Sequence, residues 1–299
     1  MPNSLLYGLV VLIWGSTWYA LTFQVGPVPA ELSVGYRFAL ASLLMLGFLA
    51  VRGERLRFGW REHARMATQG LLNIGIGYTL VYFAAALVPS GLMAVSNANI
   101  VFMTILFGAL FFRQPLRPRV IAGAAVGFLG MALVFAPDMD GFDLSGGMGL
   151  GLALVIVATA SFSIGGLLAG SNQKAGIPVL SCTAFSMVYG AAAVFVIALL
   201  RGHDFVFEWT VPYVGSLVFL AIFGSVVAFG CYFTLLGRIG ADRASYATVL
   251  FPVVALAIST FLEGYVWTGS ALAGAVLVLI GNMIATAKLS FLRARLARA

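Results

Sequence analysis

The sequence predicts an all-α membrane protein in which ten transmembrane helices form two inverted five-helix repeats. Three observations carry this prediction: the chain is poor in charge, its apolar stretches are about 20 residues long, and its basic residues fall on alternate connections. Only 9% of the 299 residues are charged, while 62% are hydrophobic. A soluble domain carries about 25% charged residues because its surface must face water. We therefore expect lipid to surround this chain.

Ten apolar windows are long enough to cross a hydrocarbon core of about 30 Å. The first has no basic residue before it and no small-x-small cleavage site after it, so we interpret it as a retained helix and not as a signal peptide. Pro89 and Gly91 separate the third window from the fourth. The windows are 4–24, 30–51, 66–88, 90–112, 118–137, 147–171, 178–200, 212–236, 241–262 and 267–288.

The basic residues test this count independently. With a cytoplasmic N-terminus, only Arg201 falls on an outside connection, and Arg37 lies within the second window. This asymmetry follows the positive-inside rule, and an error of one helix would destroy it. The sequence thus predicts a multi-pass protein of the bacterial inner membrane with both termini in the cytoplasm. The other basic residues are Arg52, Arg55, Arg57, Arg61, Arg65, Arg113, Arg117, Arg119, Lys174, Arg238, Arg243, Lys288, Arg293, Arg295 and Arg298.

The net charge of +7 could indicate a nucleic-acid partner, but its distribution argues against one. The basic residues are spread over the cytoplasmic connections, where anionic lipid headgroups attract them. They do not gather on one basic face, as nucleic-acid binding requires. The expected partners are therefore the lipid bilayer and a small-molecule substrate, with no nucleic acid.

The chain also shows signs of an internal repeat. Ala122-Gly123-Ala124 recurs as Ala273-Gly274-Ala275, and Gly130 matches Gly281 at the same offset. Five helices per half is an odd number, so the second half must enter the membrane in the opposite orientation, as in many transporters. Coincidence among small residues is the alternative. The predicted divisions are a first repeat (1–137), an external linker (138–146), a second repeat (147–288) and a basic cytoplasmic tail (289–299).

Glycines four residues apart allow two helix backbones to approach closely. We expect the pairs Gly123/Gly127, Gly147/Gly151 and Gly166/Gly170 to pack helices. The two cysteines, Cys182 and Cys231, lie inside apolar windows, which favours buried and unpaired thiols over a disulfide framework.

Short motifs along nearly the whole chain resemble the drug/metabolite transporter superfamily, specifically its EamA-type members. The matching residues are Trp14-Gly15-Ser16, Pro29, Arg37-Phe38, Tyr78, Tyr82, and the stretch from Ser245 through Pro252-Val253. The chain departs from the family where Val101 replaces a frequent proline, and where Gln114 and Tyr265 replace frequent glutamates. The resemblance implies a secondary transporter, and the YddG-like branch implies export of amino acids, aromatic ones included. Drug cations and nucleotide sugars are the alternative substrates.

Arg37 is the only charged residue well inside a window, about 10 Å from its outer end at 1.5 Å per residue. An intramembrane arginine costs at least about 2.5 kcal/mol unless it is paired or wetted. One hypothesis is that Arg37 attracts a substrate carboxylate. The alternatives are that it ties helix carbonyls together or extends outward toward Glu31.

Aromatic and polar residues at matching depth suggest a lined cavity. Trp14 and Trp18 share one helix face, as do Tyr78 and Tyr82, because residues four apart lie on the same side. Such a cavity suits an amphipathic solute; packing against lipid or other helices is the alternative for the aromatics, and simple helix bridging for Asn97 and Asn99. The candidate substrate-binding residues are Trp14, Trp18, Arg37, Tyr78, Tyr82, Ser96, Asn99, Ser163 and Tyr246.

The sequence excludes several energy sources and function classes. It has no G-x-x-x-x-G-K-[ST] loop for ATP, no H-E-x-x-H or G-x-S-x-G, and no carboxylate deep in a window. Both histidines, His63 and His203, fall in expected loops. We therefore expect no enzyme, cofactor or metal, and hypothesise facilitated diffusion, or coupling without a buried carboxylate. A channel is disfavoured because no ring of filter groups is evident. Substrate identity, transport direction and oligomeric state stay open.

Overall fold

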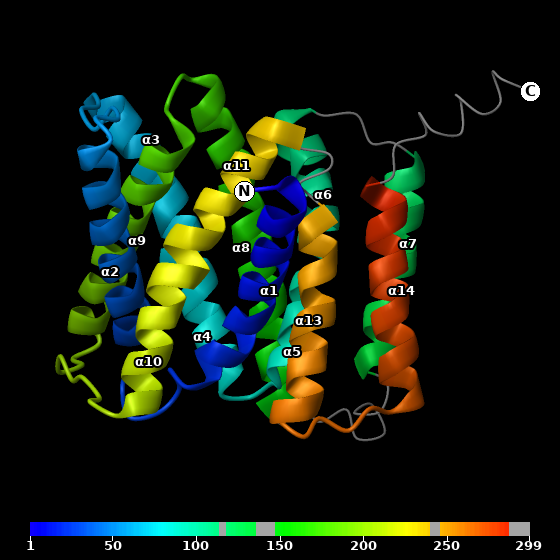
Figure 1. Ribbon diagram of the computed structural model, residues 1–299. Coiled ribbons are helices and arrows are strands. Elements are labelled where there is room, and N and C mark those ends of the chain that lie inside the picture. Colours follow the sequence, from blue (N-terminus) through cyan, green and yellow to red (C-terminus); the bar gives the residue numbers. More distant parts are fainter. Residues whose placement is uncertain (114–117, 136–146, 240–245, 287–299) are drawn as a thin grey trace, which may run out of the picture.

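The computed structural model describes residues 1–113, 118–135, 147–239 and 246–286, and these residues form helices and turns with no strand. The helices run alongside one another as a bundle (Figure 1). They are α1 (Asn3–Thr22), α2 (Ala30–Val51), α3 (Trp60–Gly70), η1 (Leu71–Tyr78), α4 (Thr79–Ala85), α5 (Ser90–Asn97), α6 (Ile100–Phe112), α7 (Pro118–Phe135), α8 (Gly147–Lys174), α9 (Val179–Leu200), α10 (Val211–Phe219), η3 (Leu220–Val227), α11 (Ala228–Ile239), α13 (Tyr246–Leu262) and α14 (Gly269–Thr286).

These elements confirm the predicted all-α membrane fold. Within the described ranges, 6 helical stretches have the length and apolar composition to cross a membrane, and three shorter helices are apolar. The third window corresponds to the continuous stretch α3–η1–α4, and the eighth to α10–η3–α11. Each of the ten windows thus contains helix, and in the fourth window two turn residues, Ala98 and Asn99, separate α5 from α6. The expected linker 138–146 and tail 289–299 lie outside the described residues.

Proline and glycine set the helix boundaries. Pro29, Pro89 and Pro178 stand immediately before α2, α5 and α9, with φ between −51° and −59°. This restricted φ suits a helix start, where a backbone N–H has no partner within the helix. Gly176 and Gly202 follow α8 and α9 with φ of 83° and 73°, a left-handed conformation that glycine adopts without a Cβ clash.

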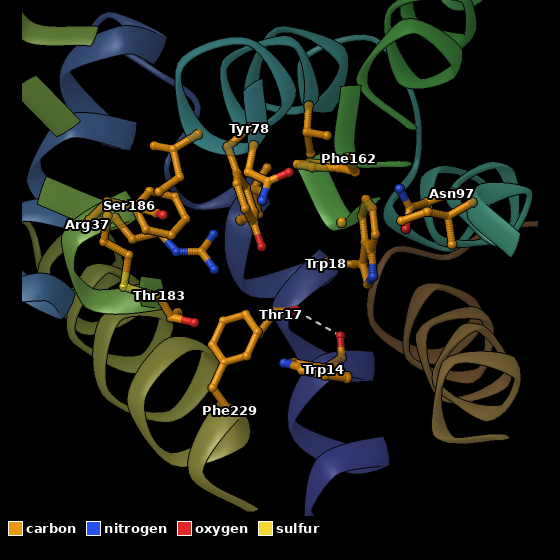
Figure 2. Close-up of a pocket in the computed structure, with 18 of the residues that line it drawn as sticks. Trp14, Thr17, Trp18, Arg37, Tyr78, Asn97, Phe162, Thr183, Ser186 and Phe229 are labelled. Atoms are coloured by element: carbon orange, nitrogen blue, oxygen red, sulfur yellow. Dashed lines mark hydrogen bonds between the residues drawn. The ribbon is translucent and has the colours of Figure 1, made fainter. Parts of the chain in front are cut away.

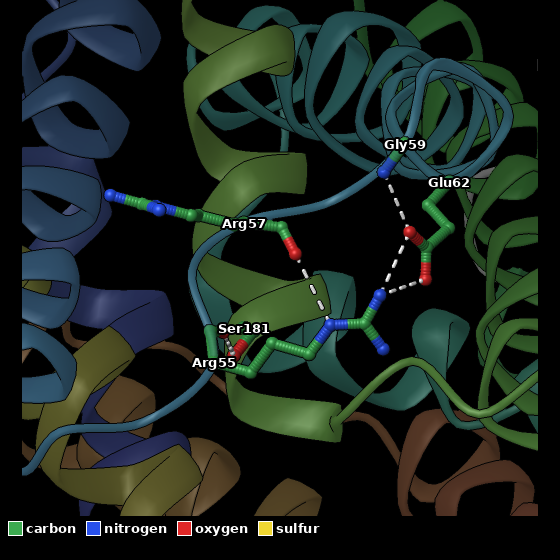
Figure 3. A network of polar contacts seen from close by, with 5 residues as sticks. All are labelled: Arg55, Arg57, Gly59, Glu62 and Ser181. Carbon is green, nitrogen blue, oxygen red and sulfur yellow. Dashed lines mark hydrogen bonds and ion pairs between the residues drawn. The ribbon is translucent and has the colours of Figure 1, made fainter.

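The start of α3 is stabilised by a polar network that also joins the two halves (Figure 3). The Gly59 amide donates to Oε2 of Glu62 at 2.7 Å, and Nη2 of Arg55 donates to both carboxylate oxygens at 2.7 and 3.0 Å. Ser181 at the start of α9 donates its hydroxyl to the Arg55 carbonyl at 2.8 Å. Because α3 begins before the apolar window, His63 lies in a helix and the expected loop position is wrong; its Nδ1 is 2.9 Å from the Tyr189 hydroxyl.

Helix pairs between the halves correspond to one another. The pair α2–α9 joins the second segments of the two halves, and the pair α7–α14 joins their fifth segments. The pair α1–α13 joins the first segment of the first half to the fourth of the second half, and α8–α6 is the corresponding pair with the halves exchanged. In α7–α14, a Cβ on Gly123 would lie 2.6 Å from the Gly281 carbonyl oxygen, and one on Gly130 would lie 2.6 Å from that of Gly274. Gly123 corresponds to Gly274 in the repeat, and Gly130 corresponds to Gly281, so exchanging the halves converts the first residue pair into the second. This reciprocity agrees with a twofold relation between them.

The expected packing of glycine pairs against neighbouring helices is confirmed for two pairs and wrong for the third. Gly123 and Gly127 pack against α14 and Phe102, and Gly147 and Gly151 pack against the end of the third segment. Gly166 and Gly170 have open space where a Cβ would stand, so their expected packing role is wrong. Spacing alone places these two glycines on one face of α8, but in the described part of the chain nothing lies within 4 Å of a Cβ at either position.

Both third segments contain a π-helical stretch, η1 in the first half and η3 in the second. A π-helical turn is wider than an α-helical turn and occurs often at functional sites. Gly75 and Gly77 lie in η1, and Gly224 lies in η3. A Cβ on Gly224 would lie 2.8 Å from Cγ2 of Thr17 and 3.7 Å from Nη2 of Arg37, so this glycine allows α1 and the guanidinium to approach η3.

Candidate substrate-binding cavity

A cavity of about 310 Å³ lies between the two halves of the bundle (Figure 2). Segments of both halves line it, whereas none of the described lining residues comes from α7 or α14. The wall is mainly aromatic and aliphatic with a few polar groups, the composition typical of small-molecule sites. The lining residues are Trp14, Thr17, Trp18, Leu21, Arg37, Phe38, Gln69, Asn73, Ile74, Tyr78, Val81, Asn97, Ile100, Phe162, Gly166, Thr183, Ser186, Met187, Phe229 and Phe251.

Trp14 and Trp18 of α1 both line the cavity, on the shared face that their spacing predicts. The Trp14 ring packs against Phe229 with its centroid 5.7 Å away, in an edge-to-face arrangement. The Trp18 ring stacks on Phe251 at 6.4 Å. Between them, Thr17 donates its hydroxyl to the Trp14 carbonyl at 2.7 Å, the dashed line of Figure 2. Helix α1 therefore presents two aromatic faces that helices of the second half hold in place.

Arg37 lies in the wall of this cavity although only 2% of its surface is exposed. Its guanidinium carbon is 4.8 Å from the ring centroids of both Phe38 and Tyr78, within the range of cation–π attraction. Its Nε is buried and has no hydrogen-bond partner among the described residues. Figure 2 shows the guanidinium pointing toward the middle of the cavity. Arg37 is thus a buried cation held by aromatic rings.

The alternative in which Arg37 reaches outward to Glu31 is wrong. Glu31, at the first turn of α2, instead forms an ion pair with Arg201 at the end of α9. The Glu31 side chain is 2% exposed and that of Arg201 is 53% exposed. In the described part of the chain, Arg37 makes no ion pair, so its charge is available to a ligand.

The two tyrosines of the third segment differ in whether they line the cavity. Tyr78, the last residue of η1, lines the cavity and packs against Phe162 with ring centroids 5.1 Å apart. Tyr82 is 2% exposed, belongs to the core cluster that includes Phe38 and Leu220, and does not line the cavity. It nevertheless lies close enough to Arg37 for an electrostatic interaction. Its proposed role is therefore to position the Arg37 guanidinium without contacting the cavity itself.

Three other candidates surround the break in the fourth segment, where α5 ends and α6 begins. Asn99 donates its Nδ2 to the Ser96 carbonyl at 3.0 Å, and Ser163 of α8 donates to the Ile100 carbonyl at 3.3 Å. All three side chains are buried behind the wall, and none lines the cavity. Ser163 thus connects the fourth segment to α8, whereas the Asn99 hydrogen bond lies within the fourth segment. Tyr246 is the first residue of α13, and its side chain lies outside the described part.

Several lining residues were not among the sequence candidates. The polar ones are Thr17, Gln69, Asn73, Asn97, Thr183 and Ser186, and the aromatic ones include Phe162, Phe229 and Phe251. Asn97 was considered only as a bridge between helices, and it does bridge α5 to α8. Gln69 lies near the end of α3, and its Oε1 accepts a hydrogen bond from Asn172 at 2.9 Å. The only sequence signal for the polar lining residues is a hydrophilic residue within an apolar window, and such residues occur in many windows.

The described lining residues carry one charge, that of Arg37, and no carboxylate. Across the described ranges, no three His, Cys, Asp or Glu side chains are placed to hold a metal ion. The cysteines are free: Cys182 is buried, with its thiol 3.3 Å from Oε1 of Gln69, and Cys231 is partly exposed. The wall therefore combines one cation, neutral hydrogen-bonding groups and aromatic faces.

The EamA-like transporter family model matches residues 3–136 and again residues 149–287. The chain belongs to the EamA-like transporter family. It is accordingly a multi-pass inner-membrane protein that transports small molecules and is not an enzyme. The family model thus matches this EamA-like chain twice in succession.

Individual relatives agree with the family. The chain is 27% identical over 286 residues to the uncharacterized inner membrane transporter YedA of Escherichia coli strain K12, covering 93% of this chain and 90% of the relative. It is 26% identical over 294 residues to a protein of Salmonella typhimurium named a probable amino-acid metabolite efflux pump, covering 92% of each. A solved crystal structure aligns with 98% of each chain at a TM-score of 0.68 and 19% identity, which shows a shared fold.

Proposed function

We propose that this EamA-like transporter exports amino acids, aromatic ones included, by binding the carboxylate of its substrate at Arg37. The observation that carries the proposal is the buried guanidinium of Arg37, which borders the cavity and has no acidic partner in the described part of the chain. A charged group in such a site gains strongly from an opposite charge that enters the cavity. A carboxylate is the amino-acid group that supplies it.

The aromatic wall supports the same class of substrate. Trp14, Trp18 and Tyr78 present flat faces to a cavity of about 310 Å³, the small end of the range of about 300–1,000 Å³ for ligand sites. Aromatic rings favour stacked or edge-to-face contact with another ring. A drug cation fits less well because the one charge in the described wall is positive. These features favour a small carboxylate with an apolar or aromatic side chain.

We further propose that the halves form an inverted repeat and expose the cavity to each side of the membrane in turn. The corresponding helix pairs and the reciprocal α7–α14 contacts support this symmetry. The π-helical stretches η1 and η3 are suited to bending, because a π-helical turn departs from regular α-helical hydrogen bonding. Pro252 inside α13 is a further bending point. The positive-inside pattern supports cytoplasmic termini, and the name of the Salmonella relative supports export.

The test is uptake into proteoliposomes that contain the purified full-length protein. We expect saturable uptake of radiolabelled tryptophan and phenylalanine, competition by either unlabelled amino acid, and no competition by phenethylamine, which lacks only the carboxylate of phenylalanine. Equal competition by phenethylamine would contradict a carboxylate site at Arg37. Uptake of a nucleotide sugar with none of an amino acid would contradict the proposed substrate class.

A further inference from the structure

Asn97 lines the cavity on the side away from Arg37 and is 7% exposed. It is the last residue of α5, at the break between α5 and α6. In transporters, broken helices often provide polar groups for the substrate near the middle of the membrane. In the view of Figure 2, Trp18 lies between Arg37 and Asn97. The two residues belong to separate regions of the core, since Phe38 beside Arg37 and Val95 and Ala98 around Asn97 lie in different clusters.

The hydrogen bonds of Thr159 determine how the Asn97 amide is oriented. Thr159 on α8 donates its single hydroxyl hydrogen to the Val155 carbonyl at 2.7 Å. It can therefore only accept from Asn97, whose Nδ2 lies 3.2 Å from the Thr159 hydroxyl oxygen. A rotated amide would set two acceptors against each other. Nδ2 must face Thr159, and Oδ1 must face away from it.

The Oδ1 atom of Asn97 has no hydrogen-bond partner in the described part of the chain, and it is not fully buried. Because Asn97 lines the cavity, this partly accessible acceptor is available to a ligand there. A buried site with a fixed acceptor discriminates against a ligand that offers no hydrogen there, because the acceptor is then desolvated without a partner. The side opposite the proposed carboxylate site consequently selects for a hydrogen-bond donor.

We infer that Asn97, oriented by Thr159, accepts a hydrogen bond from a donor at the end of the substrate remote from its carboxylate. The carrier then prefers aromatic amino acids with a ring N–H or O–H, such as the indole of tryptophan, over isosteres without one. This inference rests on the proposed function, which places the carboxylate at Arg37. In this arrangement Arg37 sets the charge of the substrate, and Asn97 sets the chemistry of its ring.

The test compares tryptophan with its benzothiophene analogue, in which sulfur replaces the indole N–H, as competitors of tryptophan uptake in proteoliposomes. We expect the wild type to favour tryptophan by about tenfold, the scale of one hydrogen bond in a desolvated site. Asn97→Leu should remove this preference, and Thr159→Val should reduce it, because the amide then has no fixed orientation. Thr159→Ser keeps the hydroxyl and should keep the preference. Arg37→Gln should weaken both ligands while leaving their ratio unchanged.

The results separate this inference from the proposed function. Equal affinity of the wild type for both ligands would overturn the role of Asn97 while leaving amino-acid transport intact. A preference that persists in both Asn97→Leu and Thr159→Val would also overturn it. Saturable uptake of neither ligand would instead contradict the proposed function, and this inference with it. Loss of the preference in Asn97→Leu and a smaller preference in Thr159→Val, with uptake retained, would support it.

Discussion

The carboxylate of Glu31, in the first turn of α2, pairs with Arg201 at the end of α9 and not with Arg37 on its own helix. Glu31 is almost fully buried, whereas Arg201 is about half exposed. This pair ties the first half to the second at one end of the bundle. It also leaves Arg37 without an acidic partner among the described residues, which makes that guanidinium available to a substrate.

Removing Arg201 should destabilise the protein more than neutralising Glu31. Arg201→Ala leaves a buried carboxylate unpaired and should cost about 1–3 kcal/mol, whereas Glu31→Gln removes the charge itself and should cost less. Thermal unfolding in detergent measures both. Arg57→Ala is the control, because Figure 3 shows its side chain pointing away from the network around Glu62. Equal effects of Arg201→Ala and Arg57→Ala would contradict a stabilising pair.

Arg37→Lys should retain part of transport, and Arg37→Gln should lose most of it. Lysine keeps the charge but lacks the planar fork of donors that a guanidinium offers a carboxylate. We expect the KM for phenylalanine to rise roughly tenfold in Arg37→Lys and roughly a hundredfold in Arg37→Gln, corresponding to about 1.4 and 2.7 kcal/mol. Unfolding curves of both variants control for folding. A KM unchanged in Arg37→Gln would exclude Arg37 from substrate binding.

Substrate binding should change the fluorescence of the two cavity tryptophans. Trp14 and Trp18 line the cavity, whereas Trp60 and Trp209 are 75% and 84% exposed at segment ends. Titration with phenylalanine, which adds little emission of its own, should therefore alter the emission of the wild type. The change should disappear in the double variant Trp14→Phe/Trp18→Phe. It should persist in Trp60→Phe/Trp209→Phe; loss of the signal in that control pair would contradict binding in this cavity.

Gly123→Ala should weaken the α7–α14 pair. The new Cβ would lie 2.6 Å from the Gly281 carbonyl oxygen, and because that atom is backbone, the helices themselves must move apart. Overpacking of this kind costs about 1–3 kcal/mol, measurable as a lower unfolding temperature in detergent. Gly47→Ala on α2 is the matched control, since nothing lies within 4 Å of the added Cβ. Similar unfolding temperatures for the two variants would show that the contact is not tight.

Glu62→Ala should loosen the start of α3. The carboxylate accepts from the Gly59 amide and pairs with Arg55, so its removal costs a helix cap, about 1 kcal/mol. Glu62→Gln keeps an acceptor for the amide but loses the charge, and should fall between wild type and Glu62→Ala. Hydrogen exchange at the amides of the first turn of α3 measures the effect. The same protection in all three proteins would exclude a capping role.

The sequence alone was sufficient for the ten segments, for the family and for Trp14, Trp18 and Tyr78 in the aromatic wall. Segment length and lack of charge depend only on the thickness of the bilayer and the cost of burying polar groups, so they can be read without a fold. Prolines such as Pro29 and Pro178 mark helix starts locally. The spacing of Trp14 and Trp18 predicted a shared face, because four residues make about one helical turn.

Only the tertiary structure decided which of these faces meet. Tyr78 and Tyr82 have the same spacing as the tryptophans, yet only Tyr78 reaches the cavity, because core side chains surround Tyr82. Glu31 is nearer to Arg37 in the chain, but the packing of α2 against α9 brings it to Arg201. The orientation of Asn97 depends on Thr159, on a helix of the other half. Contacts between distant segments are set by packing and hydrogen-bond geometry in three dimensions, and periodicity within one helix does not contain them.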